Sequence, residues 1–207
     1  MQDEQGAADQ LAADDYDVWG SLHMIHNVMY RNAQDFLGVL VQLETDLETI
    51  VAVSQTGMNV AFETIVRLAH NYLSARQMLV DHTRNTLRRY DENPVLEAYA
   101  KEVRKVTDHP AGPVLQRMRN YLVHYRVPPF VTQMEFSSPP SIKLYLKRDQ
   151  MLQYKEWTKP ARDFLESQGD LVELRVLIEE DLSRLEALYR WLYGQIGALH
   201  PFLKRSK

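Results

Sequence analysis

A short stretch of this chain gathers side chains that suit phosphate chemistry. It runs from Arg117 to Arg126 and reads Arg-Met-Arg-Asn-Tyr-Leu-Val-His-Tyr-Arg. When the stretch is plotted as a helix, Asn120 falls opposite the apolar residues, and Arg119 and His124 bracket that polar side. An arginine can hold a phosphate through two parallel hydrogen bonds, and an imidazole can move a proton near neutral pH. The pattern therefore indicates a small surface that recognises an anion.

The helix that must position these groups is bounded by prolines. Pro113 suits a first helical turn, and Pro128 ends the helix because the residue before a proline is disfavoured in helical geometry. The helix is therefore expected over residues 113–126. Its expected core stripe is Val114, Met118, Tyr121, Leu122 and Tyr125. Three residues beside its polar face are further candidates for binding the same partner: Arg117, Tyr125 and Arg126.

The rest of the chain is expected to form a helical bundle around this short helix. Apolar residues recur at helical spacing, with Gly20 and Gly38 as weak points of the first long helix. An alternating pattern on both sides of residues 137–140 predicts a β-hairpin. The expected helices are 17–53 (one long helix or two collinear ones), 59–90, 95–107, 113–126, 158–168 and 171–199, and the expected strands are 130–136 and 142–146. The predicted fold class is all-α with a β-hairpin insertion and extra C-terminal helices.

The predicted hairpin carries a second basic face. Lys143, Tyr145 and Lys147 alternate along one strand and therefore share a side of it. Basic side chains interleaved with an aromatic ring suit contact with a nucleic-acid backbone and stacking on a base. The same arrangement is also typical of the solvated side of a hairpin, so both interpretations stay open.

Composition excludes several classes of protein and of site. The chain has 207 residues and no cysteine, which excludes disulfide scaffolds, thiolate zinc sites, cysteine nucleophiles and iron–sulfur clusters. Phosphate-binding glycine-rich motifs are absent. We find no run of 18 apolar residues and no basic, apolar leader, so a cytoplasmic protein without membrane spans is expected.

Charge is distributed unevenly along the chain. Residues 1–50 hold one basic residue against ten acids, whereas residues 101–162 hold twelve basic residues against five acids. A basic segment of this kind favours a polyanionic partner. The alternative is that an acidic helix packs beside a basic segment within the same fold.

Histidines elsewhere offer a metal-binding alternative. His23 and His26 lie one turn apart on the first long helix, and His70 or His82 could approach them from the second. A metal site usually needs three or four ligands, and no Glu-x-x-His pattern accompanies this pair. We therefore expect no metal and no cofactor. His70 is predicted to be a core histidine, because it follows apolar residues of the second helix.

The segment Arg119-Asn120-Tyr121-Leu122-Val123-His124-Tyr125 resembles the motif of the HEPN superfamily, an arginine and a polar residue, usually asparagine, with a histidine four to six residues after the arginine. The resemblance covers these seven residues closely and residues 17–127 loosely. It implies a HEPN-like helical core at 17–127, a hairpin at 130–147 and C-terminal helices at 158–203. These belong to one domain over 17–207, which follows a disordered N-terminus at 1–16.

The resemblance also implies an activity. It suggests a metal-independent endoribonuclease or an RNA-binding relative, typically a homodimer, in a bacterial toxin–antitoxin or antiviral system. Arg119, Asn120 and His124 would be catalytic, with His124 as general base or acid and Arg119 stabilising the phosphorane. The predicted RNA-binding residues would be Arg117, Tyr125, Arg126, Lys143, Tyr145 and Lys147.

The chain departs from this family at one position. The toxin branch that it resembles carries a tyrosine two residues after the histidine, where an antitoxin can modify it, but Arg126 occupies that position here. The bare spacing also recurs at Arg76/His82 and Arg104/His109, without the neighbouring asparagine. A non-catalytic scaffold or regulatory module that binds a protein or nucleotide partner is therefore the alternative function.

Overall fold

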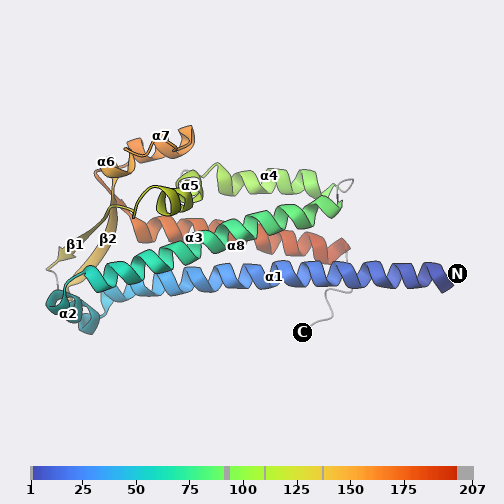
Figure 1. Cartoon of the computed structure of the whole chain (residues 1–207), viewed down its shortest axis with the longest axis horizontal. Coiled ribbons are helices and arrows are strands. Elements are labelled where there is room, and N and C mark those ends of the chain that lie inside the picture. The colour runs from blue at the N-terminus through green and yellow to red at the C-terminus, as the bar shows by residue number, and fades with distance from the viewer. Residues whose placement is uncertain (1, 91–93, 110, 137, 200–207) are drawn as a thin grey trace.

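Three long helices run side by side along the molecule in the computed structural model (Figure 1). They are α1 (Gln2–Thr45), α3 (Asn59–Leu87) and α8 (Leu174–Leu199). The structure describes the backbone of residues 2–90, 94–109, 111–136 and 138–199, and their side chains except those of 2–16, 54, 56 and 90. The predicted disorder at 1–16 falls on residues whose side chains lie outside the described part, so it stays a prediction. Helix α1 packs mainly against α3 and also contacts α8.

The first long helix ends at an aspartate, not at a glycine. Asp46 caps α2 (Leu47–Thr56) by accepting hydrogen bonds from the backbone nitrogens of Glu48 and Thr49, both at 3.3 Å. Gly20 and Gly38 lie inside α1, so the helix is not interrupted at either glycine. A capping carboxylate satisfies amide groups that a helix start leaves without partners, so it sets the break.

Shorter elements cover one side of the long helices (Figure 1). They are α4 (Val95–Thr107), α5 (Ala111–His124), α6 (Arg148–Met151) and α7 (Lys159–Ser167), and a 3₁₀ turn (Arg88–Tyr90) follows α3. The approach between α4 and α5 is close, because a Cβ at Gly112 would lie 2.6 Å from the carbonyl oxygen of Val106. The motif helix α5 packs against α3, α7 and α8.

The predicted hairpin is present and gains a third strand. Strand β1 (Phe130–Glu135) pairs antiparallel with β2 (Ser141–Lys147), and β2 pairs antiparallel with β3 (Leu171–Glu173). The predicted helix start at residue 171 is therefore wrong, since residues 171–173 pair with Tyr145, Leu146 and Lys147 before α8 begins. The protein is mostly helical, with one small antiparallel sheet at one end (Figure 1).

A buried ion pair connects the long helices within the core. Asp181 of α8 accepts hydrogen bonds from the Tyr72 hydroxyl at 2.6 Å and from Arg76 Nε and Nη2 at 2.7 and 2.8 Å. Burial alone would lower the pKa of Arg76, but the adjacent Asp181 carboxylate raises it above its ordinary value. Across the described helices, none has both the length and the apolar composition to cross a bilayer.

Candidate functional site

The motif helix α5 buries one side and exposes the other, broadly as its periodicity predicts. Val114, Met118 and Tyr121 are buried as expected, whereas Leu122 is half-buried. Tyr125 is 46% exposed, so its assignment to the core stripe is wrong. The reason is that α5 ends at His124, and the residue after it no longer follows the helical stripe.

Arg119 is a half-buried residue of α5. Its Nε is shielded from solvent and has no hydrogen-bond acceptor among the residues that the structure describes. Arg119 lies one turn from both Gln116 and Leu122, and each of these lines a cavity against α3. A desolvated N–H without an acceptor costs about 1–3 kcal/mol. Within the described part of the chain, His26 Nε2 and the Tyr193 hydroxyl are also buried without a partner.

The other two motif side chains are open to solvent to different degrees. Asn120 is half-buried, and His124 is exposed at the last position of α5. Over the described part of the chain, neither side chain forms a hydrogen bond or ion pair. Arg119 and His124 are five residues apart, which separates them by about 140° around the helix axis. One chain therefore presents the guanidinium and the imidazole toward different sides of α5.

Arg126 already has partners within the chain. Its Nε donates to the Tyr121 hydroxyl at 2.7 Å, and its Nη2 donates to the Gln150 carbonyl oxygen at 2.6 Å. The hydrogen bond to Tyr121 raises the pKa of Arg126. The guanidinium also lies 5.0 Å from the centre of the Tyr125 ring. Arg126 thus attaches the end of α5 to α6, a role that the sequence pattern did not predict.

An aromatic cluster surrounds the end of α5. Tyr125 lies 5.2 Å from Tyr121 and 5.1 Å from Tyr154 between ring centres, and Tyr121 stacks on Trp157 at 5.8 Å. The cluster fixes the ring of Tyr125 next to His124 while leaving part of it accessible. A partly exposed, held tyrosine is suited to stacking on a base.

The basic hairpin face lies among carboxylates. Ile142, Leu144 and Leu146 point into the core, so the three predicted RNA-binding residues of this strand share its other face. Lys143 Nζ lies 3.9 Å from Glu135 Oε1. Burial raises the pKa of Tyr145, and the Glu173 charge raises it further. Here β2 packs against the acidic α1, as the intramolecular interpretation of the charge pattern predicts.

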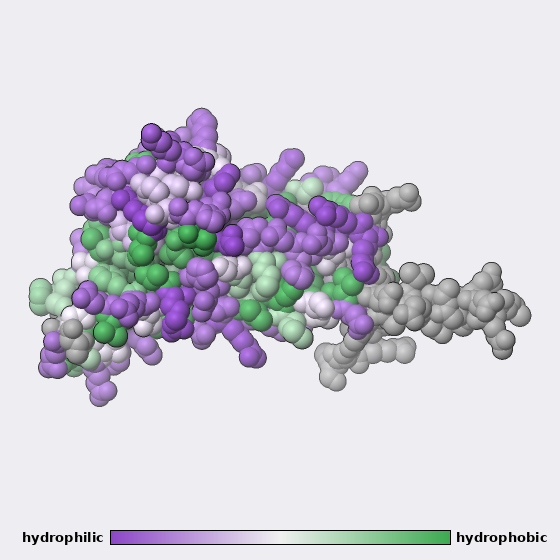
Figure 2. Space-filling view, in the orientation of Figure 1, coloured by the Kyte–Doolittle hydropathy of each residue, from purple (hydrophilic) through white to green (hydrophobic). Residues whose placement is uncertain are grey.

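A groove runs beside α5 on the α3 side. Its volume is about 730 Å³. It is lined by Phe62, Val66, Leu122 and Val127, by Asn59 and the acidic Glu63 in the first turns of α3, and by the polar residues Arg67, His70 and Asn71. Figure 2 shows apolar side chains gathered between α3 and α5 with polar ones on both sides.

These three polar residues of α3 were missed at the sequence level. His70 is exposed, so the prediction of a core histidine is wrong. Helical spacing places Arg67, His70 and Asn71 on one side of α3, and this signal could have identified them. Only the structure shows that this side faces the end of α5.

The histidine pair of α1 packs against aromatic rings. His26 stacks on Tyr189 at 4.7 Å between ring centres, and His23 meets the edge of Tyr193 at 5.6 Å. Burial lowers the pKa of His26, and the neighbouring His23 lowers it further. Among the side chains that the structure describes, no group of three potential metal ligands occurs.

Comparisons with protein-family models, with curated proteins and with solved structures find no match for this chain. The chemical interpretation of the site therefore depends on the chain's own residues. On α5 these residues are Arg119 with its shielded Nε, the amide Asn120 and the exposed His124. The ring of Tyr125 packs beside them against Tyr121. Such a set can bind a phosphodiester and exchange one proton with it.

Proposed function

We propose that this protein is a metal-independent endoribonuclease of HEPN type that acts as a homodimer. The observation that carries the proposal is Arg119, whose Nε is buried without an acceptor on the same short helix as an exposed His124. Asn120 between them matches the motif that the chain resembles. A phosphate oxygen would bind at the terminal nitrogens of the Arg119 guanidinium.

The proposed reaction is transfer of the scissile phosphate to the neighbouring 2′-hydroxyl. The 2′-oxygen forms a bond to phosphorus, its proton passes to His124, and the bond from phosphorus to the 5′-oxygen breaks. The departing 5′-oxygen takes a proton from an imidazolium, which leaves a 2′,3′-cyclic phosphate and a 5′-hydroxyl. Arg119 stabilises the charge of the phosphorane, and Asn120 orients the imidazole or a phosphate oxygen.

The proposed homodimer accounts for the different directions in which Arg119 and His124 leave α5. Within one copy, Arg119 and His124 leave α5 about 140° apart, so they do not face the same phosphate easily. Two α5 helices that face each other would place the His124 of one copy beside the Arg119 of the other. The proposed homodimer therefore supplies a base and an acid as well as a composite anion site.

The proposed setting is a bacterial toxin–antitoxin or antiviral system. Within it, regulation by modification of a tyrosine two residues after His124 is not part of the proposal, because Arg126 holds that position and is hydrogen-bonded to Tyr121. An antitoxin or regulatory protein would instead act by covering the face of α5. The groove beside α5, with Arg67 and His70, provides additional positive and polar surface for RNA.

The experiment is RNA cleavage by the purified full chain in the presence of a metal chelator. His124→Ala is expected to lower the rate by about 10²–10⁴-fold, because general acid–base transfer contributes this much. His82→Ala is the matched control, since His82 is an exposed histidine of α3 away from α5. Products should carry a 2′,3′-cyclic phosphate.

The alternative is a non-catalytic module that binds a protein or nucleotide partner, and the divergence of Arg119 from His124 favours it. Wild-type protein that binds RNA but never cleaves it would support this module and exclude the nuclease. Equal cleavage rates for wild type and His124→Ala would also remove the catalytic assignment. Loss of cleavage in both His124→Ala and His82→Ala would indicate a general defect in folding and would count against His124.

A further inference from the structure

A second cavity lies where α3, α4, α5 and α8 meet, apart from the groove beside α5. It encloses about 130 Å³. Two guanidinium groups line it, those of Arg76 and Arg84, together with the phenol of Tyr99. Of the described residues that line this cavity, none is acidic. It involves neither Arg119 nor His124, so an inference about it stands apart from the RNA-cleavage proposal.

Arg76 contributes a guanidinium that is held firmly in place. Its side chain is 7% exposed, and Asp181 binds its Nε at 2.7 Å and its Nη2 at 2.8 Å. The third nitrogen, Nη1, has no acceptor within the part of the chain that the structure describes. One donor of a buried, fixed cation is therefore available to a molecule in the cavity that Arg76 lines.

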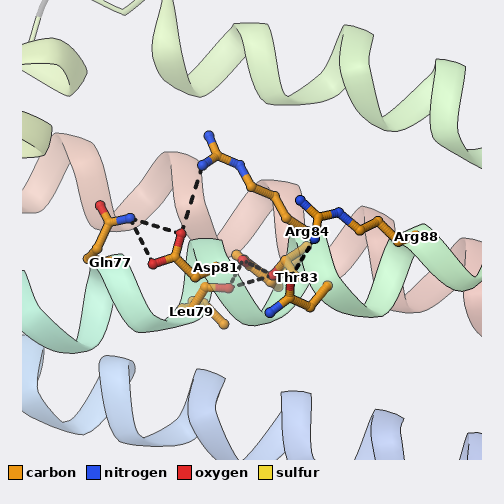
Figure 3. A network of polar contacts seen from close by, with 8 residues as sticks. Gln77, Leu79, Asp81, Thr83, Arg84 and Arg88 are labelled. Atoms are coloured by element: carbon orange, nitrogen blue, oxygen red, sulfur yellow. Dashed lines mark hydrogen bonds and ion pairs between the residues drawn. The ribbon is translucent and has the colours of Figure 1, made fainter.

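Arg84 contributes a guanidinium that is able to move. Its Nη1 lies 3.8 Å from Asp81 Oδ1, and the two side chains are 59% and 54% exposed. An exposed pair at this distance holds its partners weakly. Figure 3 shows the Arg84 side chain rising from α3 on the side of α4, above Asp81. Arg84 can therefore turn toward the cavity without losing a strong interaction.

Tyr99 supplies a neutral donor opposite these cations. Burial raises its pKa, while the charge of Arg84 lowers it, which places the phenol close to the Arg84 guanidinium. The raised pKa keeps the hydroxyl protonated at neutral pH. Arg76, Arg84 and Tyr99 line the same cavity from two helices. Arg76 and Tyr99 offer donors to it, and Arg84 adds a third once its side chain turns inward.

The remaining walls are mainly apolar, and the space is small. Val80, Val103, Leu185 and Leu188 line it from three helices. Its volume of about 130 Å³ is close to that of a cavity of about 150 Å³ known to accept benzene. The apolar walls do not replace the hydration shell of a doubly charged anion, so they disfavour phosphate. A single charge on a compact apolar body fits both the donors and the walls.

We propose that this cavity binds a small monocarboxylate, either aromatic or branched aliphatic. The carboxylate receives hydrogen bonds from Arg76, Arg84 and Tyr99, and the apolar body lies between α4 and α8. Because the cavity joins four helices, the bound molecule stabilises their packing. The protein thereby carries a small-molecule site in its bundle that is separate from the polar face of α5.

The test is isothermal titration calorimetry of the full chain with sodium benzoate, sodium isobutyrate and inorganic phosphate. Benzoate or isobutyrate is expected to bind at millimolar concentration or below, and phosphate is not. Arg84→Gln should weaken binding about tenfold or more, as expected for loss of a charge-assisted hydrogen bond. Tyr99→Phe should weaken it about two- to tenfold, because a neutral hydrogen bond is lost.

Arg104→Gln is the matched control, since Arg104 is an exposed arginine of α4 that does not line the cavity. Circular dichroism confirms that each variant is folded before titration. Unchanged affinity in Arg104→Gln with weaker binding in Arg84→Gln supports the proposal. Equal losses in the two arginine variants, binding of phosphate in preference to the carboxylates, or no heat from either carboxylate overturns it.

Discussion

Replacing Asp181 by asparagine tests how the buried ion pair between α3 and α8 contributes to stability. The Asp181 carboxylate accepts three hydrogen bonds, at 2.6, 2.7 and 2.8 Å, and its side chain is 1% exposed. Asp181→Asn keeps the shape but leaves the Arg76 charge buried without compensation. Breaking a buried pair in this way costs about 3–5 kcal/mol. This is a large part of the 5–15 kcal/mol that is usual for a folded protein.

A second variant separates the cost of the broken pair from the value of the intact one. Replacing Tyr72, Arg76 and Asp181 together by Phe, Met and Leu removes every polar atom of the network. Well-packed apolar residues in place of a buried ion pair are often neutral or stabilising by about 1–4 kcal/mol. The triple variant is therefore expected to be at least as stable as wild type, although Asp181→Asn is much less stable.

Urea unfolding followed by far-ultraviolet circular dichroism measures both free energies at neutral pH. Raising the pH would not replace the mutation, because the pKa of Arg76 is raised further above its ordinary value and the guanidinium stays charged. A loss below about 1 kcal/mol for Asp181→Asn would refute the reasoning, since the pair would then be weakly coupled to folding. A triple variant as unstable as Asp181→Asn would show that the loss comes from packing.

Three further perturbations test local features. Gly112→Ala should destabilise the fold by about 1–3 kcal/mol, because the new Cβ would lie 2.6 Å from the Val106 oxygen; Gly38→Ala, with nothing within 4 Å, should stabilise α1 by up to about 1 kcal/mol in the same urea titration. The Thr49 hydrogen bond lowers the pKa of Asp46. The stability that the Asp46 cap contributes is therefore present above the unfolded pKa of 3.8 and is lost as the pH falls through the folded pKa. Asp46→Asn should not show this loss in acid titrations of stability, because its amide caps the helix without titrating. Burial lowers the pKa of His26, so the unfolded chain binds its proton more tightly, and the free energy of unfolding should decrease as pH falls from 6.5 toward the lowered pKa. His26→Phe should show a weaker pH dependence in this range, and an unchanged slope would contradict the assignment.

Much of the fold follows from local signals in the chain. Pro128 ends the motif helix near the predicted place, and the alternation of Ile142, Leu144 and Leu146 predicts a strand with one buried side. These signals act within a few residues, so the sequence alone expresses them. The helix break at Asp46 was not predicted. The aspartate favours a new helix start, but the apolar residues on both sides of it keep a helical spacing that predicts an uninterrupted helix.

The candidate site was predictable in its residue types but not in its surroundings. Spacing identifies Arg119 and His124, yet only the structure shows that the Nε of Arg119 is shielded from solvent. The short strand β3 also required a partner, since Val172 pairs with Leu146 across the sheet. Likewise, only the structure shows that Arg126 donates a hydrogen bond to the Gln150 carbonyl oxygen. Long-range partners decide such roles, and periodicity carries no information about them.

The attachment made by Arg126 links two regions that the sequence separates. Its guanidinium lies two positions after His124 and holds the carbonyl oxygen of Gln150, which belongs to the segment that follows the hairpin. The direction of the imidazole therefore depends on the placement of that later segment. A substitution in the hairpin that shifts α6 is therefore expected to change the position of His124 as well, although the hairpin and His124 are separate in sequence.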